Sequence, residues 1–442
     1  MEIATTRFGK FAGLALVLAS GALAASSTET PMGWASQSGG TTGGAGGTVV
    51  TVKTMADLQK YAKASGKYVI WVDGTMGSFG TRGEGNGDRV TVSSDKSILG
   101  LPGAHIKGGF DLSGVKNVIL RNLIVEGPGA CDNKCGSAGE NRQDNITIVN
   151  GTTNVWLDHM DIFDGEDGNT DITKKSDYVT VSNTKFHYTD KSYASGTAGY
   201  SHRYCNLLGG SDDSTKEGAH NLNVTFYRTW WGEGVGERMP RVRFGKVHVA
   251  NSLFTSTDPG QNHCVRAAYK ANLVVEGNVF IGQKKPIDLY NNDFVAITVK
   301  DNLFTGCSGN MTGSGTAFTP PYTLPMSSTA ALEADLKDPV TGAGATITCW
   351  DNGCKPTDIE GSHSENGPLG LVSLVHAPHG ELFVNGQEHA VSAVLLDLAG
   401  REVGRSEVAA GSSWMLPQGN AGQMLRVTGK GAIRTLQLSR VH

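Results

Sequence analysis

The chain has 442 residues, which is long enough for two or three domains by length alone, although elongated β folds often run longer as a single unit. Glycine is abundant at 60 residues and charged residues make up only 18%, a composition that suits a turn-rich β protein better than a helical one. With a net charge of −4, the chain has no basic field that would favour nucleic acid. An anionic polymer would therefore have to bind in a local cationic groove.

The N-terminus is predicted to be a secretory signal at residues 1–24. Arg7 and Lys10 provide a positive start, residues 11–22 form a short apolar run, and Ala22-Leu23-Ala24 is a small-residue cleavage site. The apolar run is too short to span a membrane, and no later stretch is long enough. We therefore expect export, with no membrane span, to the extracellular space or the cell surface.

Seven cysteines follow the signal, and in an exported protein they can form disulfides. They are Cys131, Cys135, Cys205, Cys264, Cys307, Cys349 and Cys354. Cys131 with Cys135 and Cys349 with Cys354 are plausible local bridges, but the sequence does not fix the pairing, and the odd number leaves at least one thiol. A zinc site at the first pair is the alternative, but no matching Cys or His pair stands at ligand spacing.

The first elements are predicted between residues 41 and 65. A glycine-rich turn at Thr41–Gly47 precedes a strand at Val49–Val52, and Met55–Ser65 is predicted to be a short helix that caps the end of the following fold. The turn does not match a phosphate-binding loop, because no Lys-Ser/Thr closes the motif and no helix begins immediately after it.

From Asn117 onward a loosely repeated unit appears, in which an alternating apolar strand is followed by a polar turn residue and then an aromatic or aliphatic one. Copies lie at Val118–Ile124, Val155–Ile162, Val179–Phe186 and Val247–Phe254. A strand and turn at this period predict a solenoid, in which each coil buries its apolar face on its neighbours. A β-sandwich is the alternative, but its turns usually recur about every 8–12 residues, which is a shorter period.

Asparagines mark the turns of this repeat. Asn251, Asn278 and Asn302 follow one another at steps of 27 and 24 residues. At matching turn positions they would stack as a hydrogen-bonded ladder along the axis of the solenoid.

The C-terminal part is predicted to be a separate β-rich module. The solenoid domain spans residues 25–354, residues 355–370 form a linker rich in Gly, Ser, Pro and charge, and residues 371–442 contain about six short strands. The Ala399-Gly400 turn after Val394–Leu398 predicts a hairpin. This module is similar to the small C-terminal β-sandwich sorting domains of some secreted bacterial enzymes, which implies a β-sandwich-like domain, and a carbohydrate-binding module is the alternative.

Charged residues concentrate in two segments. Residues 238–243 read Arg-Met-Pro-Arg-Val-Arg, and two carboxylates, Asp167 and Asp171, lie upstream, with Asp144 one coil earlier. Residues one coil apart in a solenoid lie roughly 5 Å apart, so three acids on adjacent coils can share a hard divalent cation. Each acid alone would be interpreted as a solvated turn aspartate, but the arginine cluster favours a functional site.

These segments, together with Trp156-Leu157-Asp158-His159, resemble the pectate lyase family (polysaccharide lyase family 1). The resemblance covers about residues 38–350. It implies an all-β, right-handed parallel β-helix that cleaves polygalacturonate by calcium-assisted β-elimination. It further implies that Asp144, Asp167 and Asp171 bind Ca²⁺.

The same resemblance implies roles for two arginines. Arg238 would be the catalytic base, although a guanidinium normally stays protonated and can act so only where calcium and neighbouring cations disfavour its charged form. Arg243 would bind the substrate carboxylate, to which its planar fork is suited. Arg241 would share a face with Arg243 if the strand already begins there, but Pro240 leaves that open, and Arg241 is assigned no role.

The family's third substrate-binding cation is a lysine in a His-Asp-Lys triplet, which this chain matches only in part. Thr189-Asp190-Lys191 has the last two residues, but an insertion separates it from the strand that follows. Counting back from Gly209 places Tyr204 at the lysine position, with Arg203 beside it. The third cation is therefore either Lys191 or Arg203, and Arg203 is favoured because it directly precedes the aligned strand.

Other polar and aromatic residues are predicted to be structural. Asp158 and His159 should form hydrogen bonds in a turn, since no serine stands in a nucleophile motif that would make His159 part of a triad. Trp230 and Trp231 are expected to pack at a corner of the coil rather than stack on sugar rings.

The sequence thus predicts a secreted, monomeric, calcium-dependent pectate lyase that acts on de-esterified (1→4)-α-D-galacturonan and releases 4,5-unsaturated oligogalacturonides. A pectin lyase acting on methyl-esterified pectin would not need the three acids. A polygalacturonase would explain Asn169-Thr170-Asp171 and Asp212-Asp213, but its Gly-His-Gly and Arg-Ile-Lys motifs are absent. A non-catalytic β-helix that binds polysaccharide is the remaining alternative.

Overall fold

A computed structural model describes most of the chain up to Trp350 and the strands of the C-terminal part. The described residues are 30–80, 87–130, 143–190, 202–348, 350, 372–377, 380–385, 390–396, 402–410, 412–416, 424–429 and 432–437. The predicted signal, Lys191 and the cysteine pairs Cys131/Cys135 and Cys349/Cys354 lie outside these ranges.

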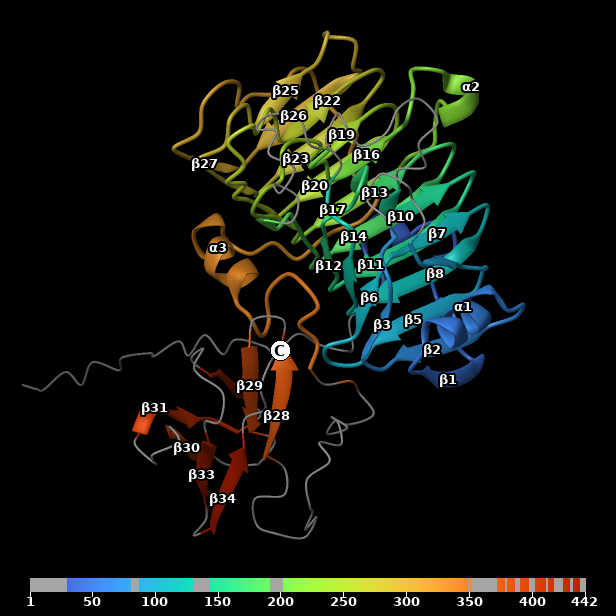
Figure 1. Cartoon of the computed structure of the whole chain (residues 1–442). Coiled ribbons are helices and arrows are strands. Elements are labelled where there is room, and N and C mark those ends of the chain that lie inside the picture. The colour runs from blue at the N-terminus through green and yellow to red at the C-terminus, as the bar shows by residue number, and fades with distance from the viewer. Residues whose placement is uncertain are drawn as a thin grey trace, which may run out of the picture.

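Within these residues the chain winds into a right-handed parallel β-helix, and three parallel sheets run along its axis (Figure 1). Sheet 1 contains β1 (Thr48–Val52), β2 (Tyr68–Val72), β5 (Lys96–Gly100), β8 (Lys116–Arg121), β11 (Thr153–Asp158), β14 (Asp177–Ser182), β17 (Val224–Tyr227), β20 (Lys246–Ala250), β23 (Asn272–Glu276) and β26 (Ala296–Lys300).

Sheet 2 contains β4 (Arg89–Thr91), β7 (Gly109–Ser113), β10 (Asp144–Val149), β13 (Gly168–Ile172), β16 (Asn206–Leu208), β19 (Arg241–Val242), β22 (Val265–Ala267) and β25 (Ile287–Leu289). Sheet 3 contains β3 (Thr75–Gly77), β6 (His105–Lys107), β9 (Ile124–Glu126), β12 (Asp161–Phe163), β15 (Lys185–His187), β18 (Trp230–Trp231), β21 (Leu253–Phe254), β24 (Val279–Ile281) and β27 (Leu303–Thr305). The predicted solenoid is confirmed, and the β-sandwich alternative is wrong for this part of the chain.

The interior of the coil is filled by side chains that stack from one turn to the next. On sheet 3, Trp231, Phe254 and Phe280 are fully buried, and their ring centroids are separated by 4.6 Å and 4.1 Å. Phe186 and Phe304 extend this stack at its two ends. Trp231 therefore packs inside the coil, as predicted, and its Nε1 donates a hydrogen bond to Asn206 Oδ1.

The turn after sheet 1 carries a polar ladder, but its register differs from the prediction. Asn251 is level with Gly277 rather than with Asn278, and both Asn251 and Gly277 have positive φ values, which Asn and Gly adopt most easily. The ladder runs through the next turn position, where Asn302 Oδ1 accepts from Asn278 Nδ2 at 2.9 Å and Asn278 Oδ1 accepts from the Ser252 amide at 2.8 Å. The predicted equivalence of the three asparagines is therefore wrong for Asn251.

Asp158 anchors the same turn three coils before Asn251. It is fully buried and accepts hydrogen bonds from Arg121, Ser182 and Asn183, while His159 Nδ1 lies 2.6 Å from its second oxygen. Burial alone would raise the pKa of Asp158, but His159 and Arg121 hold it below its usual range. The predicted structural role of Asp158 and His159 is confirmed by these contacts.

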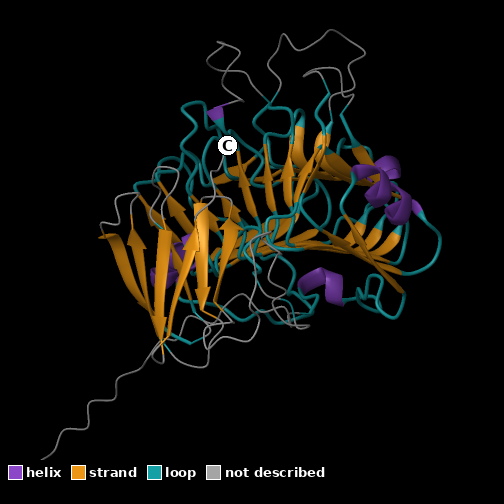
Figure 2. Cartoon of the chain, turned by 60° about the horizontal axis from the view of Figure 1, so that its bottom comes forward, coloured by secondary structure: helices purple, strands orange, loops and turns teal. Residues whose placement is uncertain are grey.

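Short helices lie outside the coiled sheets (Figure 2). They are η1 (Gly33–Ser36), α1 (Met55–Lys63), α2 (Ser214–Glu217) and α3 (Thr329–Lys337). Helix α1 buries Leu58 and Ala62 against the first coils, so the prediction that it caps the end of the fold is confirmed. Thr54 is its N-cap residue, and the Thr54 side chain accepts a hydrogen bond from the Asp57 amide. Helix α3 packs Leu332 and Leu336 on sheet 3.

The glycine-rich turn at Thr41–Gly47 contacts the coil rather than a ligand. The amides of Thr42 and Gly43 both donate to Asn117 Oδ1, at 2.6 Å and 2.7 Å, and the Gly44 amide donates to Ser97 Oγ. A Cβ at residue 44 would lie 1.8 Å from the main-chain oxygen of Tyr68, so the turn needs glycine to approach β2 closely.

The last described residue before the C-terminal part, Trp350, returns to the first coils. Its ring lies edge-on to Trp71 at 4.9 Å, and its Nε1 donates to the Gly100 oxygen.

The C-terminal part has a three-stranded and a four-stranded antiparallel sheet among its described residues, built from β28 (Val372–Ala377), β29 (Gly380–Asn385), β30 (Val391–Leu396), β31 (Glu402–Val408), β32 (Ser413–Met415), β33 (Met424–Gly429) and β34 (Ala432–Gln437). Strands β30 and β31 pair antiparallel, which confirms the predicted hairpin. None of the helices in the described ranges is long and apolar enough to cross a membrane.

The aromatic stack should contribute strongly to stability. Phe254→Ala would leave a cavity between Trp231 and Phe280 and is expected to lower the free energy of unfolding by about 3–5 kcal/mol, measured by urea denaturation. Phe254→Leu, which keeps most of the volume, should cost clearly less. Equal losses in the two variants would contradict the role of ring packing.

Candidate active site

The outer face of sheet 2 brings an acid and two arginines from distant parts of the sequence into one row. Strand register places Asp171 beside Leu207, Leu207 beside Arg241, and Arg241 beside Arg266. Adjacent strands are about 4.8 Å apart, so this row crosses four coils over a short distance. The expected convergence of acids and arginines on one face of the solenoid is present in the structure.

Two of the predicted acids, Asp144 and Asp171, face a common space above Gly168. Asp144 pairs with Gly168 in register, and a Cβ added at residue 168 would lie 2.7 Å from Asp144 Oδ1 and 3.7 Å from Asp171 Oδ1. Glycine at this position therefore leaves room between the two carboxylates. Asp144 Oδ1 is buried and has no hydrogen-bond partner in the described structure.

The third acid, Asp167, lies at the rim of this space. Its Oδ1 is 2.8 Å from His202 Nδ1, and its side chain is 38% exposed. The carboxylates repel one another, because Asp167 raises the pKa of both Asp144 and Asp171. The negative charges are therefore close enough to interact.

Burial strengthens this effect. It is the main cause that raises the pKa of Asp144 well above its usual range, followed by repulsion from Asp171 and Asp167. Burial likewise raises the pKa of Asp171 to about 7, against the opposing charge of Arg238 and a hydrogen bond from the Leu207 amide. In the absence of a cation, ionisation of both carboxylates therefore costs free energy.

Arg238 approaches these acids from the coil of β19, two coils beyond Asp171. Its guanidinium lies 4.1 Å from the centre of the Tyr204 ring, and its charge lowers the pKa of both Asp144 and Asp171. Its Nε is 3.9 Å from Glu237 and is buried without a hydrogen-bond partner in the described part of the chain. Arg238 has φ 62°, a left-handed conformation, immediately before the cis peptide bond between Met239 and Pro240.

Strand β19 begins at Arg241, directly after Pro240, which answers the question left open by the sequence. Val242 points inward and is fully buried, so Arg241 and Arg243 share the outer face. Arg243 Nε donates to Asp212 Oδ1 at 2.8 Å, and its Nη1 donates to the Gly209 oxygen. Asp212 is 62% exposed, so this partner is a surface group that a substrate carboxylate can replace.

Arg203 is placed differently from a substrate-facing cation. Its Nε and Nη2 donate to the two oxygens of Asp258, at 2.6 Å and 2.9 Å, and both side chains are buried. Such a bidentate pair satisfies much of the guanidinium and fixes the segment before Tyr204. No local pattern in the sequence pointed to Asp258 as its partner. Lys191, the other predicted third cation, lies outside the described residues.

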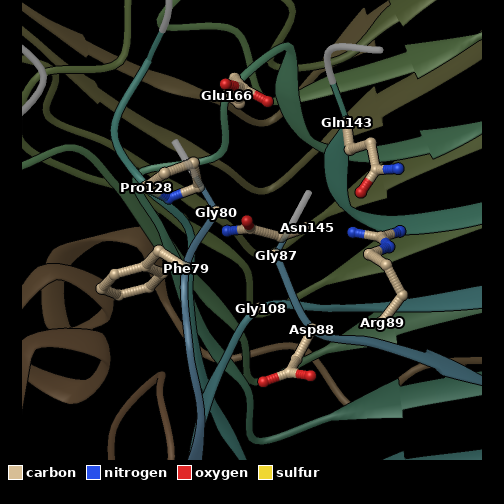
Figure 3. Close-up of a pocket in the computed structure, with 10 residues that line it drawn as sticks. All are labelled: Phe79, Gly80, Gly87, Asp88, Arg89, Gly108, Pro128, Gln143, Asn145 and Glu166. Carbon is tan, nitrogen blue, oxygen red and sulfur yellow. The ribbon is translucent and has the colours of Figure 1, made fainter. Parts of the chain in front are cut away.

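A small pocket borders the acids at the end of sheet 2 (Figure 3). Arg89 and Gln143 lie on one side of it and Phe79 on the other. Arg89 Nη1 donates to the main-chain oxygen of Asp144 at 2.6 Å, and its charge acts on the Asp144 carboxylate. Arg89 also forms an ion pair with Asp111, so its guanidinium already has protein partners and serves to position Asp144.

The fit of these acids to a divalent cation depends on their chemistry and on the space between them. In the described ranges, no three Asp, Glu, His or Cys side chains already stand at metal-ligating distances. The carboxylate oxygens are nevertheless the donor type that Ca²⁺ prefers, Asp144 Oδ1 is an unpartnered buried atom, and the space above Gly168 is one that a Cβ would fill. The residues present therefore fit a hard cation, provided that the side chains adjust to it.

Comparison with known proteins agrees with this geometry. A family model described as "Pectate lyase" matches residues 5–331. The chain belongs to the pectate lyase family. It is 32% identical over 316 residues to pectate lyase plyB of Emericella nidulans, a match that covers 69% of this chain and 85% of that protein. It is 36% identical over 261 residues to a pectate trisaccharide-lyase of Thermotoga maritima, which covers 56% and 65% of the two chains.

Solved structures support the same fold. A crystal structure of a Bacillus pectate lyase in complex with trigalacturonate superposes with a TM-score of 0.56 and 23% identity, and the match covers 72% of this chain and 99% of that one. Family membership identifies the protein as an enzyme of the pectate lyase class, and the right-handed β-helix is the architecture that it shares with this structure.

The raised pKa of Asp171 predicts how stability changes with pH in a chelator. The unfolded chain releases this proton near pH 4 and the folded one near pH 7, so stability should fall as pH rises through that window. Asp171→Asn removes the effect, and at pH 8 with chelator it should be more stable than the wild type by about 1–3 kcal/mol, the cost of an unsatisfied buried group.

Urea unfolding at pH 4 and at pH 8 tests this, and the advantage of the variant should vanish at the lower pH. Added Ca²⁺ at pH 8 should stabilise the wild type and have a smaller effect on the variant. A variant that is less stable than the wild type in chelator at pH 8 would contradict the repulsion described above.

Proposed function

We propose that the protein is a secreted, calcium-dependent pectate lyase that cleaves de-esterified polygalacturonate by β-elimination and releases 4,5-unsaturated oligogalacturonides. The observation that carries this proposal is the position of Arg238, whose charge acts on Asp144 and Asp171 across one face of sheet 2. The site thus combines acidic oxygen ligands with a cation from two coils further along, in the family that the comparisons show.

In this proposal, Arg243 binds the carboxylate of the uronate and Arg238 removes the proton from C5. A Ca²⁺ ion held by Asp144, Asp167 and Asp171 would, when bound, neutralise the substrate carboxylate and make the C5 proton more acidic. The electron pair of the C5–H bond forms the C4–C5 double bond, and the bond from C4 to the glycosidic oxygen breaks. The leaving oxygen takes a proton from solvent.

The aromatic neighbours of Arg238 position its guanidinium. An arginine can accept a proton only when its side chain is neutral, so elimination should accelerate as the pH rises. The face of the Tyr204 ring contacts the guanidinium at 4.1 Å, and His202, whose ring centroid lies 4.8 Å from that of Tyr204, also contacts Asp167. The aromatic contacts therefore connect the base to one of the acids and fix their relative positions.

Two rival functions fit these contacts less well. A polygalacturonase needs an acid and a base on either side of the glycosidic bond. In the described structure, however, Asn169 is fully buried and bonded to the Gly165 amide, while Asp212 is bound to Arg243. A pectin lyase acting on uncharged esters would have no use for the repelling pair Asp144 and Asp171.

Export to the extracellular space or the cell surface is supported by the signal-like residues 1–24, and the seven strands described for the C-terminal part fit an accessory or sorting role for residues 371–442. We place the catalytic domain at residues 25–354 and the linker at residues 355–370, and we propose a monomer.

The activity is tested by the ultraviolet absorbance of the purified protein incubated with polygalacturonate. With Ca²⁺, a rising signal from the C4–C5 double bond is expected, and excess chelator should abolish it. A rise that survives chelation would favour a pectin lyase mechanism. New reducing ends without absorbance would mean hydrolysis. If both signals are absent, the binding-protein alternative would be favoured.

The base assignment predicts a specific kinetic defect. Arg238→Lys keeps a positive charge but places it differently, and kcat on polygalacturonate should fall by about 10²–10⁴-fold, the range typical of a lost general base, with little change in KM. Arg243→Lys is the matched comparison and should act mainly on KM. If Arg238→Lys kept more than a tenth of the wild-type kcat at saturating Ca²⁺, another group would have to be the base.

A further inference from the structure

Arg241 is a half-buried cation for which the described structure provides no anion. No hydrogen bond or ion pair involves its side chain within the described part of the chain, and its Nε is buried without a partner. Its one contact of note is with the face of Tyr290, whose ring centre lies 5.4 Å from the guanidinium carbon. Burying an unpaired charge is costly, so a residue kept in this state calls for a ligand.

The surroundings of Arg241 are strongly cationic. Burial is the main cause that lowers its pKa to about 10, followed by the charges of Arg243, Arg266 and Arg238, while Glu237 acts in the opposite direction. Arg243 is paired with Asp212, Arg266 with Asp288, and Arg238 has Glu237 3.9 Å from its Nε. Among the described residues of the row, Arg241 therefore has hydrogen-bonding capacity that no acid uses.

The position of Arg241 is suited to contact with a substrate rather than with a structural ion. It lies two strands from Asp171 in the same outward row, about 10 Å along the axis, and on the same face as Arg243. A polyanion that reaches the acids and Arg243 therefore passes Arg241 as well. Its guanidinium offers the planar fork that binds carboxylates in a bidentate manner.

We propose that Arg241 binds a uronate carboxylate of the substrate and supplies the third substrate-binding cation, in place of the lysine position that Tyr204 occupies in this chain. This inference rests on the proposed function in its substrate class, a polyuronate. Arg203 is held by the buried Asp258, so its guanidinium is already paired, whereas that of Arg241 is open.

The test compares Arg241→Gln, Arg241→Lys and the control Lys246→Gln, which removes an exposed cation at the start of β20 in sheet 1. Affinity electrophoresis in gels containing polygalacturonate measures binding independently of turnover, and kinetics with saturating Ca²⁺ separates KM from kcat. Arg241→Gln should weaken retardation and raise KM by about ten- to a hundredfold, the loss of one charge-assisted contact, with kcat changed less than about threefold. Arg241→Lys should recover part of the affinity, and Lys246→Gln should match the wild type.

Thermal unfolding separates binding from a structural role. Removing an unpaired cation from a cationic row relieves repulsion, so the Tm of Arg241→Gln should stay level or rise. Retardation and KM equal to those of the wild type, or a Tm that falls by several degrees, would overturn the proposal. If the wild type binds polygalacturonate but shows no elimination, the proposed function fails while the binding comparison still decides the role of Arg241.

Discussion

The in-register stacking of parallel coils is the constraint on which the rest of this structure depends. Each strand of sheet 2 pairs with the equivalent strand of the next coil, so residues that are dozens of positions apart in sequence become neighbours about 4.8 Å apart. Asp171, Arg241 and Arg266 lie in one row only because this register holds over several coils. A slip of one residue would turn these side chains into the core.

The stacked core allows the outer face to hold charges that repel one another. Ionising Asp144 and Asp171 costs free energy, and Arg241 is half-buried without an anion among the described residues, so the candidate site lowers the stability of the free protein. The continuous aromatic stack around Phe254 and the fully bonded carboxylate of Asp158 lie in the same coils and offset that cost. The electrostatic conflict on the surface is the kind that a cation and an anionic ligand would relieve together.

Much of this arrangement could be predicted from the sequence, because the repeat fixes the fold and the fold fixes which charges meet. The acids and arginines were found from their motifs and from the resemblance to a known family, and helix α1 from its pattern. The register of the turn ladder was missed at Asn251, since coils differ in length by a residue or two and a fixed period does not show where the extra residue lies. The pairing of Arg203 with Asp258 was missed because an ion pair between separate coils leaves no local pattern.

Tyr204 and Arg241 together indicate how this site balances its charge. A lysine at position 204 would place a further cation beside Arg238, in a region where the pKa of Arg241 is already lowered by burial and by its arginine neighbours. An aromatic ring at that position supports the guanidinium of Arg238 through its face and adds no charge. The positive charge that the substrate needs can then come from Arg241, which lies on the outer face of β19 in the same coil as Arg238. Uronate binding and proton removal would thereby be assigned to two arginines of one coil.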